Sequence, residues 1–236
     1  MLSKISNFSG PSSTLFGRRS TGFTLVQGNK LPTFGATGQS PFPATGWTSL
    51  ISVTNDDAFT TVNIPFTFPF NGTNYTTYYP NSNTYITFGA GTTQYNGLAA
   101  SSPAYNKIFF AAKDNSWQRV SSTQSTSFHR LRWEGTNTTS GAVGSPNMVY
   151  EMTLFNPTFT GGVPWIELLV GTQSSGTNSV GVISGLYSST AKLTGGDLGP
   201  FPNRGVAPLT SYVMIGNTAG TSWTVYTGYY VGGTNY

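Results

Sequence analysis

The 236 residues of the sequence include no cysteine. Disulfides, thiol nucleophiles and thiolate metal sites are therefore excluded. Because small secreted domains often depend on disulfides, the lack of cysteine also argues against secretion. The stretch MLSKISNFSGPSSTLFGRRSTGF has no apolar core of signal-peptide length, and no run approaches the ~18 apolar residues of a membrane span. We expect a protein made in the cytoplasm, without a signal peptide and without membrane insertion.

Charge is scarce as well. Asp, Glu, Lys and Arg make up 8% of the residues, against roughly 25% in an average soluble domain. The net charge of +4 comes from 11 basic and 7 acidic side chains, and Arg18-Arg19 is the only adjacent basic pair. A nucleic-acid-binding protein usually carries a basic patch or stripe, so we expect no nucleic-acid partner.

Recognised catalytic motifs are missing too. The single histidine, His129, shares a strand face with Leu131 and Trp133, which favours a packed side chain over a general base. "GAGTTQYNG" lacks the lysine of a phosphate-binding loop. Asn55, Asp56 and Asp57 lack the spacing of a calcium loop, so a turn is the favoured interpretation. We expect neither a metal nor another cofactor.

The three glutamates, Glu134, Glu151 and Glu167, could in principle form a facing pair of the kind that a glycosidase uses. Arg130 and Arg132 lie close to them in the sequence, and the strand period places these charges on common faces. Cross-strand Arg–Glu pairing on a mostly solvated face is the simpler interpretation. We therefore predict a non-enzymatic protein.

What the sequence has in abundance is glycine, proline and aromatic residues, with 29 glycines, 14 prolines and 14% aromatics. Strand-length runs recur every ten to fifteen residues from about Thr48 onward, separated by Gly, Asn or Pro, and no useful helical period is present. This pattern predicts an all-β protein, an antiparallel β-sandwich of jelly-roll or immunoglobulin-like kind over residues 46–236.

The span "IPFTFPFNGTNYTTYYPNSNTYITFG" shows the strand pattern most clearly. Ile64, Phe66, Phe68 and Phe70 alternate with two prolines, which predicts an edge or bulged strand because proline removes ladder donors. Asn71-Gly72 predicts a tight hairpin. The rings of this charge-free span are expected to form one wall of the core.

Residues 1–45 differ from the rest, because isolated large apolar residues lie between Gly, Pro and Ser. A floppy tail is one interpretation. We favour an extended N-terminal arm that binds a partner, because each large apolar residue costs solubility unless it is buried. The partner-binding residues would be Leu15, Phe16, Arg18, Arg19, Phe23, Leu25 and Phe34.

A second binding surface could come from tyrosine rings, since aromatic faces stack on sugars. Four tyrosines cluster in the sequence and could face a glycan, although buried tyrosines would give the same pattern. They are Tyr75, Tyr78, Tyr79 and Tyr95.

The same aromatic span resembles a β motif of nidogen-like extracellular sandwich domains and of structural proteins of tailed bacteriophages, notably cyanophages. Asn83-Thr84-Tyr85 stands where Asn-Gly-Tyr is common. The resemblance covers about thirty residues well and carries no catalytic residue. It implies a virion structural protein, a capsid decoration or a tail or fibre component, whose arm docks on other virion proteins. Copies are expected to form a homo-oligomer. The alternative is a carbohydrate-binding or adhesive module that binds a host-surface glycan.

Overall fold

The computed structural model describes residues 46–51, 57–94, 104–112, 117–135, 148–173, 183–198 and 210–229. Residues 1–45, on which the expected arm falls, lie outside this set. The described elements are β-strands and one 3₁₀ turn, η1, at Pro157–Phe159. In chain order the strands are β1 Thr48–Ile51, β2 Val62–Phe70, β3 Thr73–Asn81, β4 Tyr85–Phe88, β5 Asn106–Ala112, β6 Trp117–Gln124, β7 Phe128–Gly135, β8 Met148–Phe155, β9 Trp165–Gln173, β10 Ile183–Tyr187, β11 Thr210–Gly216 and β12 Trp223–Tyr229.

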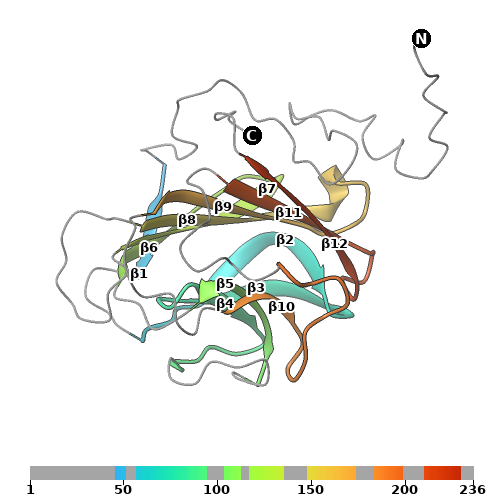
Figure 1. Cartoon of the computed structure of the whole chain (residues 1–236), viewed down its shortest axis with the longest axis horizontal. Helices are drawn as coiled ribbons and strands as arrows, with labels where there is room; N and C mark the ends of the chain where they lie inside the picture. Colours follow the sequence, from blue (N-terminus) through green and yellow to red (C-terminus); the bar gives the residue numbers. More distant parts are fainter. Residues whose placement is uncertain are drawn as a thin grey trace, which may run out of the picture.

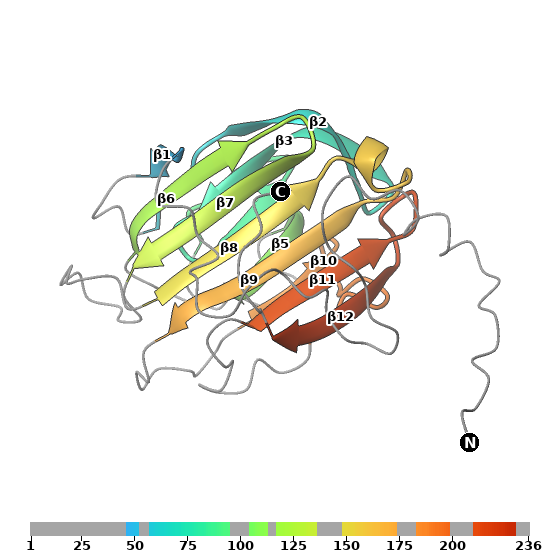
Figure 2. The same ribbon diagram turned by 90° about the horizontal axis from the view of Figure 1, so that it is seen from above.

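The strands form two antiparallel sheets that pack face to face (Figures 1 and 2). One sheet has the order β1-β6-β7-β8-β9-β11-β12, and the other has the order β10-β5-β4-β3-β2. Strands β2 to β5 run as a meander in the second sheet, and β6 to β9 run as a meander in the first. The chain therefore crosses between the sheets after β1, after β5, and before and after β10. The predicted all-β sandwich is confirmed.

Strand β2 lies at the edge of the five-stranded sheet, as its two prolines predict. Its pairing with β3 shifts register between Asn63 and Phe68, so the strand is also bulged. Asn71 and Gly72 form the hairpin turn with φ of 49° and 75°, the positive values that a type I′ turn requires. Both local predictions for this span are confirmed.

The core between the sheets is largely aromatic. Phe68, Phe70, Tyr78 and Phe88 are at most 1% exposed, and the ring centroids of Phe70 and Phe88 lie 4.8 Å apart. Side chains of the facing sheet, including Trp133, complete this core. The predicted wall of rings is thus present, and at roughly 25 cal/mol per Å² its burial is the main favourable term of folding.

The turn that joins β3 to β4 is a buried polar cluster. Asn81, Ser82, Asn83 and Thr84 are all 0% exposed. Trp133 of the facing sheet donates from Nε1 to the Asn81 carbonyl at 2.8 Å. Since a buried polar group without a partner is costly, this bond fixes the distance and orientation of the two sheets at this point.

Thr84 carries the departure from the common motif. Its φ is 61°, a left-handed conformation that glycine adopts without strain and that is rare for a β-branched residue. The Thr84 carbonyl accepts from the Phe110 amide at 3.1 Å. The turn therefore keeps the backbone conformation that the glycine of Asn-Gly-Tyr would favour. The left-handed conformation of Thr84 reduces the free energy of unfolding by about 1–2 kcal/mol.

At the opposite end of the hairpin, backbone hydrogen bonds join the two sheets. Asn71 donates to the Gly220 carbonyl at 2.9 Å, and Gly72 donates to the Ala219 carbonyl at 2.8 Å. Ala219 and Gly220 lie in the turn between β11 and β12. The β2–β3 hairpin is thereby attached to the last hairpin of the other sheet.

Strand β6 is the element that the sequence pattern did not reveal. Its sequence WQRVSSTQ is rich in Ser, Thr and Gln, which resembles a loop by composition. It nevertheless pairs with both β1 and β7. Ladder hydrogen bonds and the buried Val120 hold it in place.

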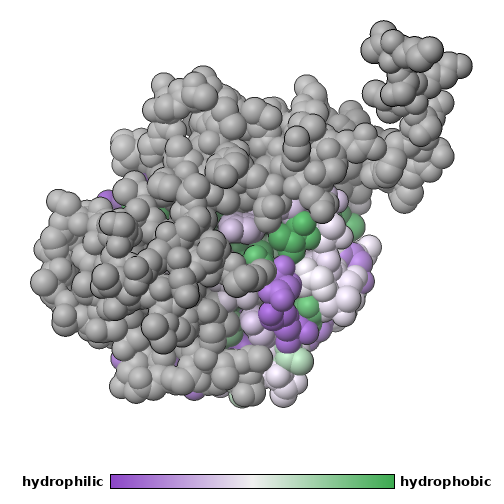
Figure 3. Space-filling model, in the orientation of Figure 1, coloured by the Kyte–Doolittle hydropathy of each residue, from purple (hydrophilic) through white to green (hydrophobic). Residues whose placement is uncertain are grey.

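The visible described surface mixes hydrophilic and hydrophobic residues in small groups (Figure 3). Among the described residues, the exposed large hydrophobic side chains are those of Phe59, Tyr105 and Phe159. They lie in three segments that are far apart in the sequence. They therefore do not suggest an extended apolar docking surface.

We predict that Gly220→Ala destabilises the protein more than Gly162→Ala does. Both positions have positive φ, but a Cβ at Gly220 would lie 2.6 Å from the Pro69 carbonyl oxygen, whereas nothing lies within 4 Å of a Cβ at Gly162. The steric clash should add about 1–3 kcal/mol to the loss of unfolding free energy. Urea denaturation of both variants measures the difference. Equal losses would show that the contact between the two hairpins does not constrain the sandwich.

Candidate functional site

The charged residues of the seven-stranded sheet form a continuous ladder on its outer face. Strand pairing places Arg119 opposite Glu134 and Arg132 opposite Glu151. Arg119 contacts Glu134 directly. The remaining contacts of the ladder are Arg132 Nη1–Glu134 Oε1 at 3.8 Å, Arg132 Nη2–Glu151 Oε1 at 2.8 Å, Arg130 Nη1–Glu151 Oε2 at 3.7 Å and Arg130 Nη2–Glu167 Oε2 at 3.9 Å.

The expected Arg–Glu pairing is therefore confirmed, but the expectation of a solvated face is wrong. The side chains of Arg130 and Arg132 are 6% exposed, and those of Glu151 and Glu167 are at most 1% exposed. Only the Arg119 end reaches solvent, with 54% of the side chain exposed. Burial changes the energetics, because breaking a buried pair leaves an uncompensated charge.

Glu151 lies at the centre of the ladder. Arg132 donates to its Oε1 from Nε at 2.9 Å as well as from Nη2. Burial raises the pKa of Glu151, and the positive charges of Arg130 and Arg132 oppose that rise. All three glutamates of the chain have arginine partners. These contacts support a structural role for the carboxylates rather than the facing pair of a glycosidase.

An apolar cluster continues the same outer face beside the ladder. Phe155, Trp165 and Val213 are 3–5% exposed, and Phe128 and Tyr226 pack against them. The guanidinium of Arg130 lies 5.3 Å from the centroid of the Phe128 ring. The seven-stranded sheet thus has buried side chains on both of its faces, although its composition suggested one solvated face.

Trp47 marks the point where residues 1–45 join the described body. Its ring lies over the Arg132 guanidinium, with 4.1 Å from Cζ to the ring centroid. This cation–π contact attaches the first described residues to the middle of the ladder. The arm residues Leu15, Phe16, Arg18, Arg19, Phe23, Leu25 and Phe34 lie outside the described residues.

The tyrosines predicted to face a glycan do not form one exposed surface. Tyr78 is 0% exposed and belongs to the core, so the prediction for this residue is wrong. Tyr75 is half-buried against the Phe88 ring at 4.7 Å between centroids, and Tyr79 is half-buried beside Phe59. Tyr95 lies outside the described residues.

His129 has the packed position that the sequence predicts, beside a pocket that the sequence did not reveal. It is 2% exposed, and its ring meets that of Tyr78 edge-on at 5.4 Å. Its Nδ1 lies 3.0 Å from Gln124 Oε1, while Nε2 is buried without a hydrogen-bond partner. Burial lowers the pKa of His129 to about 4. The imidazole is therefore neutral at pH 7.

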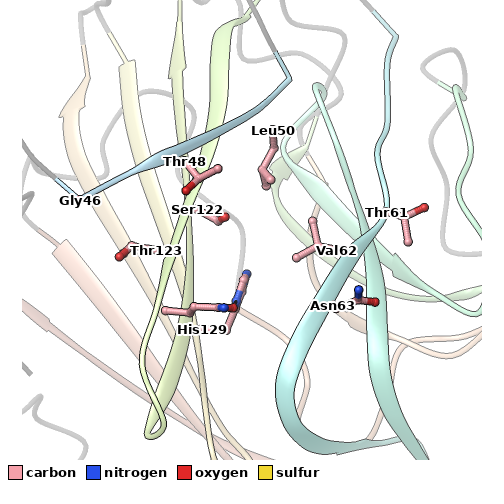
Figure 4. Close-up of a pocket in the computed structure, with 10 residues that line it drawn as sticks. Gly46, Thr48, Leu50, Thr61, Val62, Asn63, Ser122, Thr123 and His129 are labelled. Atoms are coloured by element: carbon pink, nitrogen blue, oxygen red, sulfur yellow. Dashed lines mark hydrogen bonds between the residues drawn. The ribbon is translucent and has the colours of Figure 1, made fainter.

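The pocket beside His129 has a volume of about 420 Å³ and opens between the two sheets (Figure 4). Strands β1, β6 and β7 form one wall, and β2 forms the other. Sequence analysis missed it because the lining residues come from separated, polar stretches. No contiguous stretch of the sequence signals it, because the lining residues come from four strands. The lining residues are Gly46, Thr48, Leu50, Thr61, Val62, Asn63, Ser122, Thr123, Gln124 and His129.

Within the described part of the chain, no group of three or more His, Asp or Glu side chains is placed to hold a metal ion. Asp57, from the acidic stretch considered for calcium, accepts from Asn83 Nδ2 at 2.9 Å and has a φ of 52°. It thus belongs to the turn that supports the buried polar cluster. The same part of the chain includes no helix of the length and apolar character needed to cross a membrane.

Residues 33–138 match the family model described as NIDO related. The match covers less than half of the chain and includes the strands from β1 to β7. It supports the nidogen-like part of the motif resemblance. No curated protein and no solved structure matches the chain.

We predict that Arg132→Met is far more damaging than Arg119→Met. Removing Arg132 takes two short hydrogen bonds from the buried Glu151 and the stacking partner from Trp47, so unfolding free energy should fall by about 3–5 kcal/mol. Arg119 is the exposed end of the same ladder, and its loss should cost at most about 1 kcal/mol. Urea denaturation of both variants measures the contrast. Similar small losses would contradict the ladder as a stabilising element.

We further predict that His129 makes the fold acid-sensitive. The pKa of His129 in the folded protein, about 4, lies below the ordinary value of 6.5. The contribution of the neutral imidazole to the stability of the fold is therefore fully present above pH 6.5 and is lost as the pH falls toward 4. The loss should reach about 3 kcal/mol. His129→Phe should flatten the pH dependence between these values. Unfolding free energies of both proteins across this range test it, and identical slopes would contradict the assignment.

Proposed function

We propose that the chain is a non-enzymatic structural protein of a virion, a capsid decoration or a tail or fibre component. It would be made in the host cytoplasm and docked on other virion proteins through residues 1–45. In this role the β-sandwich is a rigid body displayed from the particle. Copies on a symmetric particle would have equivalent positions and would associate with one another.

The observation that carries the proposal is the anchored junction at Trp47. The Trp47–Arg132 contact fixes the start of the described body on a sheet with buried side chains on both faces. An arm that leaves from a fixed point can order on a partner without disturbing the body. The entropy lost in ordering the arm would be offset by burial of its spaced aromatic residues.

Two further findings support a binding and assembly role. The NIDO-related match is of the kind expected for a β-rich module of extracellular, adhesive type. The glutamates serve the ladder, as their arginine contacts indicate. The phage assignment comes from the motif resemblance of residues 64–89, and the experiment below is designed to test it.

Arm substitutions test this proposal directly. We expect the full-length protein to co-sediment with particles, purified from the source of the sequence, that have been depleted of it. Replacing Phe16, Phe23 and Phe34 by Ser should reduce co-sedimentation about tenfold or more, because each lost aromatic anchor removes about 1.5–3 kcal/mol of burial.

Phe159→Ser serves as the matched control, since it removes an exposed ring from a loop of the body. It should bind particles normally. Circular dichroism should show that all variants retain the β-fold. Binding of the arm variant at the level of the control would contradict attachment through the arm, and failure of the full-length chain to bind would contradict the virion assignment.

A further inference from the structure

The pocket between β1, β2, β6 and β7 has the size and position of a ligand site. Its volume of about 420 Å³ lies within the roughly 300–1,000 Å³ of small-molecule sites. It lies where the edge strand β2 diverges from the other sheet, and Figure 4 shows Ser122 and His129 on one wall and Val62 on the other directed toward the gap. His129 projects into this gap from β7, opposite Val62 of β2.

Among the described residues, the lining carries no charged side chain. Hydroxyl groups come from Thr48 and Ser122 and an amide group comes from Gln124, whereas Thr61, Asn63 and Thr123 are lining residues whose side chains occupy the alternate strand positions. Each hydroxyl donates one hydrogen bond and accepts others, and each amide does both. His129, with its lowered pKa, adds no charge at neutral pH. Such a lining complements a neutral ligand with several hydroxyl groups, and it offers no ionic partner to a phosphate, a carboxylate or an amine.

His129 supplies the clearest specific contact. With Nδ1 donating to Gln124 Oε1, the neutral imidazole has a lone pair on Nε2. This atom is buried and has no hydrogen-bond partner. A buried acceptor without a hydrogen bond reduces the stability of the fold by about 1–3 kcal/mol. A ligand hydroxyl that donates to Nε2 would recover part of this free energy.

The apolar side chains of Leu50 and Val62 complete the pocket. A sugar ring presents C–H groups on its faces and hydroxyls around its edge, so it needs both kinds of lining. We propose that this pocket binds an uncharged, polyhydroxylated ligand, a neutral saccharide unit, with a ligand hydroxyl donating to His129 Nε2. The inference is independent of the virion assignment.

The test uses the full-length chain labelled with ¹⁵N and observed by NMR. The probes are maltose, cellobiose, lactose, N,N′-diacetylchitobiose and methyl α-mannoside, at low-millimolar concentration. Glucuronate and glucosamine serve as charged comparators. We expect at least one neutral sugar to shift the amide signals of Thr48, Thr61 and Asn63. The Nε2 resonance of the single histidine should shift in the same titration.

Two tryptophan variants of adjacent exposed residues separate the pocket from the rest of β1. Thr48 lines the pocket, whereas Ser49 is not among its lining residues and pairs with Ser121 of β6. Thr48→Trp should fill the pocket and weaken binding about tenfold or more. Ser49→Trp should leave it unchanged. His129→Phe keeps an aromatic ring beside Tyr78 and removes the acceptor, so it should also weaken binding.

Three results would overturn the proposal. The first is that no sugar of the panel shifts the pocket signals, which would indicate that the pocket holds only water. The second is equal binding by Thr48→Trp and Ser49→Trp. The third is binding of glucuronate or glucosamine as strong as that of the neutral sugars. None of these results depends on attachment to a particle, so the two proposals fail separately.

Discussion

The hydrogen bond from Trp133 to the Asn81 carbonyl is the constraint on which the sandwich depends. It joins β7 of one sheet to a turn of the other whose four residues are all completely buried. Asn81 also donates to the Thr92 carbonyl at 2.7 Å and accepts from the Asn83 amide at 2.7 Å. These bonds satisfy polar groups that could not otherwise be buried. The aromatic core provides most of the free energy, but it is non-directional. The polar turn supplies the directional contact that positions the two sheets.

The Arg–Glu ladder solves a related problem on the outer face. A chain with so few charges places half of its arginines and all of its glutamates in one alternating row. The row contains three charges of each sign, so it is neutral as a whole. A slip of one residue in β7 or β8 would move these charges to the core face. The ladder therefore specifies register as well as adding stability. In a wrong register these charges would be buried without their partners, and the free energy of desolvating them would not be recovered.

Local features of the sequence predicted local features of the fold. Pro65 and Pro69 placed β2 at an edge, Asn71-Gly72 formed the expected hairpin, and the expected Arg–Glu pairing is present, for example between Arg132 and Glu151. Burial of the ladder and of Tyr78 could not be predicted in this way, because it depends on what covers each face. Strand β6 was missed for a similar reason. Its Ser and Thr side chains carry little hydrophobic signal, and its pairing with β1 and β7 is a tertiary property. The pocket combines residues from four strands, so no contiguous pattern could reveal it.

The low charge of the chain also bears on how it could recognise a partner. Recognition through charge would need exposed ionic groups, and the buried ladder leaves chiefly Arg119 exposed among its members. The described lining of the pocket offers hydroxyl and amide groups beside the neutral imidazole of His129. Such groups discriminate by geometry, because each ligand hydroxyl must match a donor or an acceptor of fixed position. A sandwich whose sheets are joined by hydrogen bonds at both ends of the β2–β3 hairpin keeps those positions fixed. In the proposed ligand pocket, selectivity for a neutral ligand would thus follow from the same use of polar, uncharged side chains that makes the fold rigid.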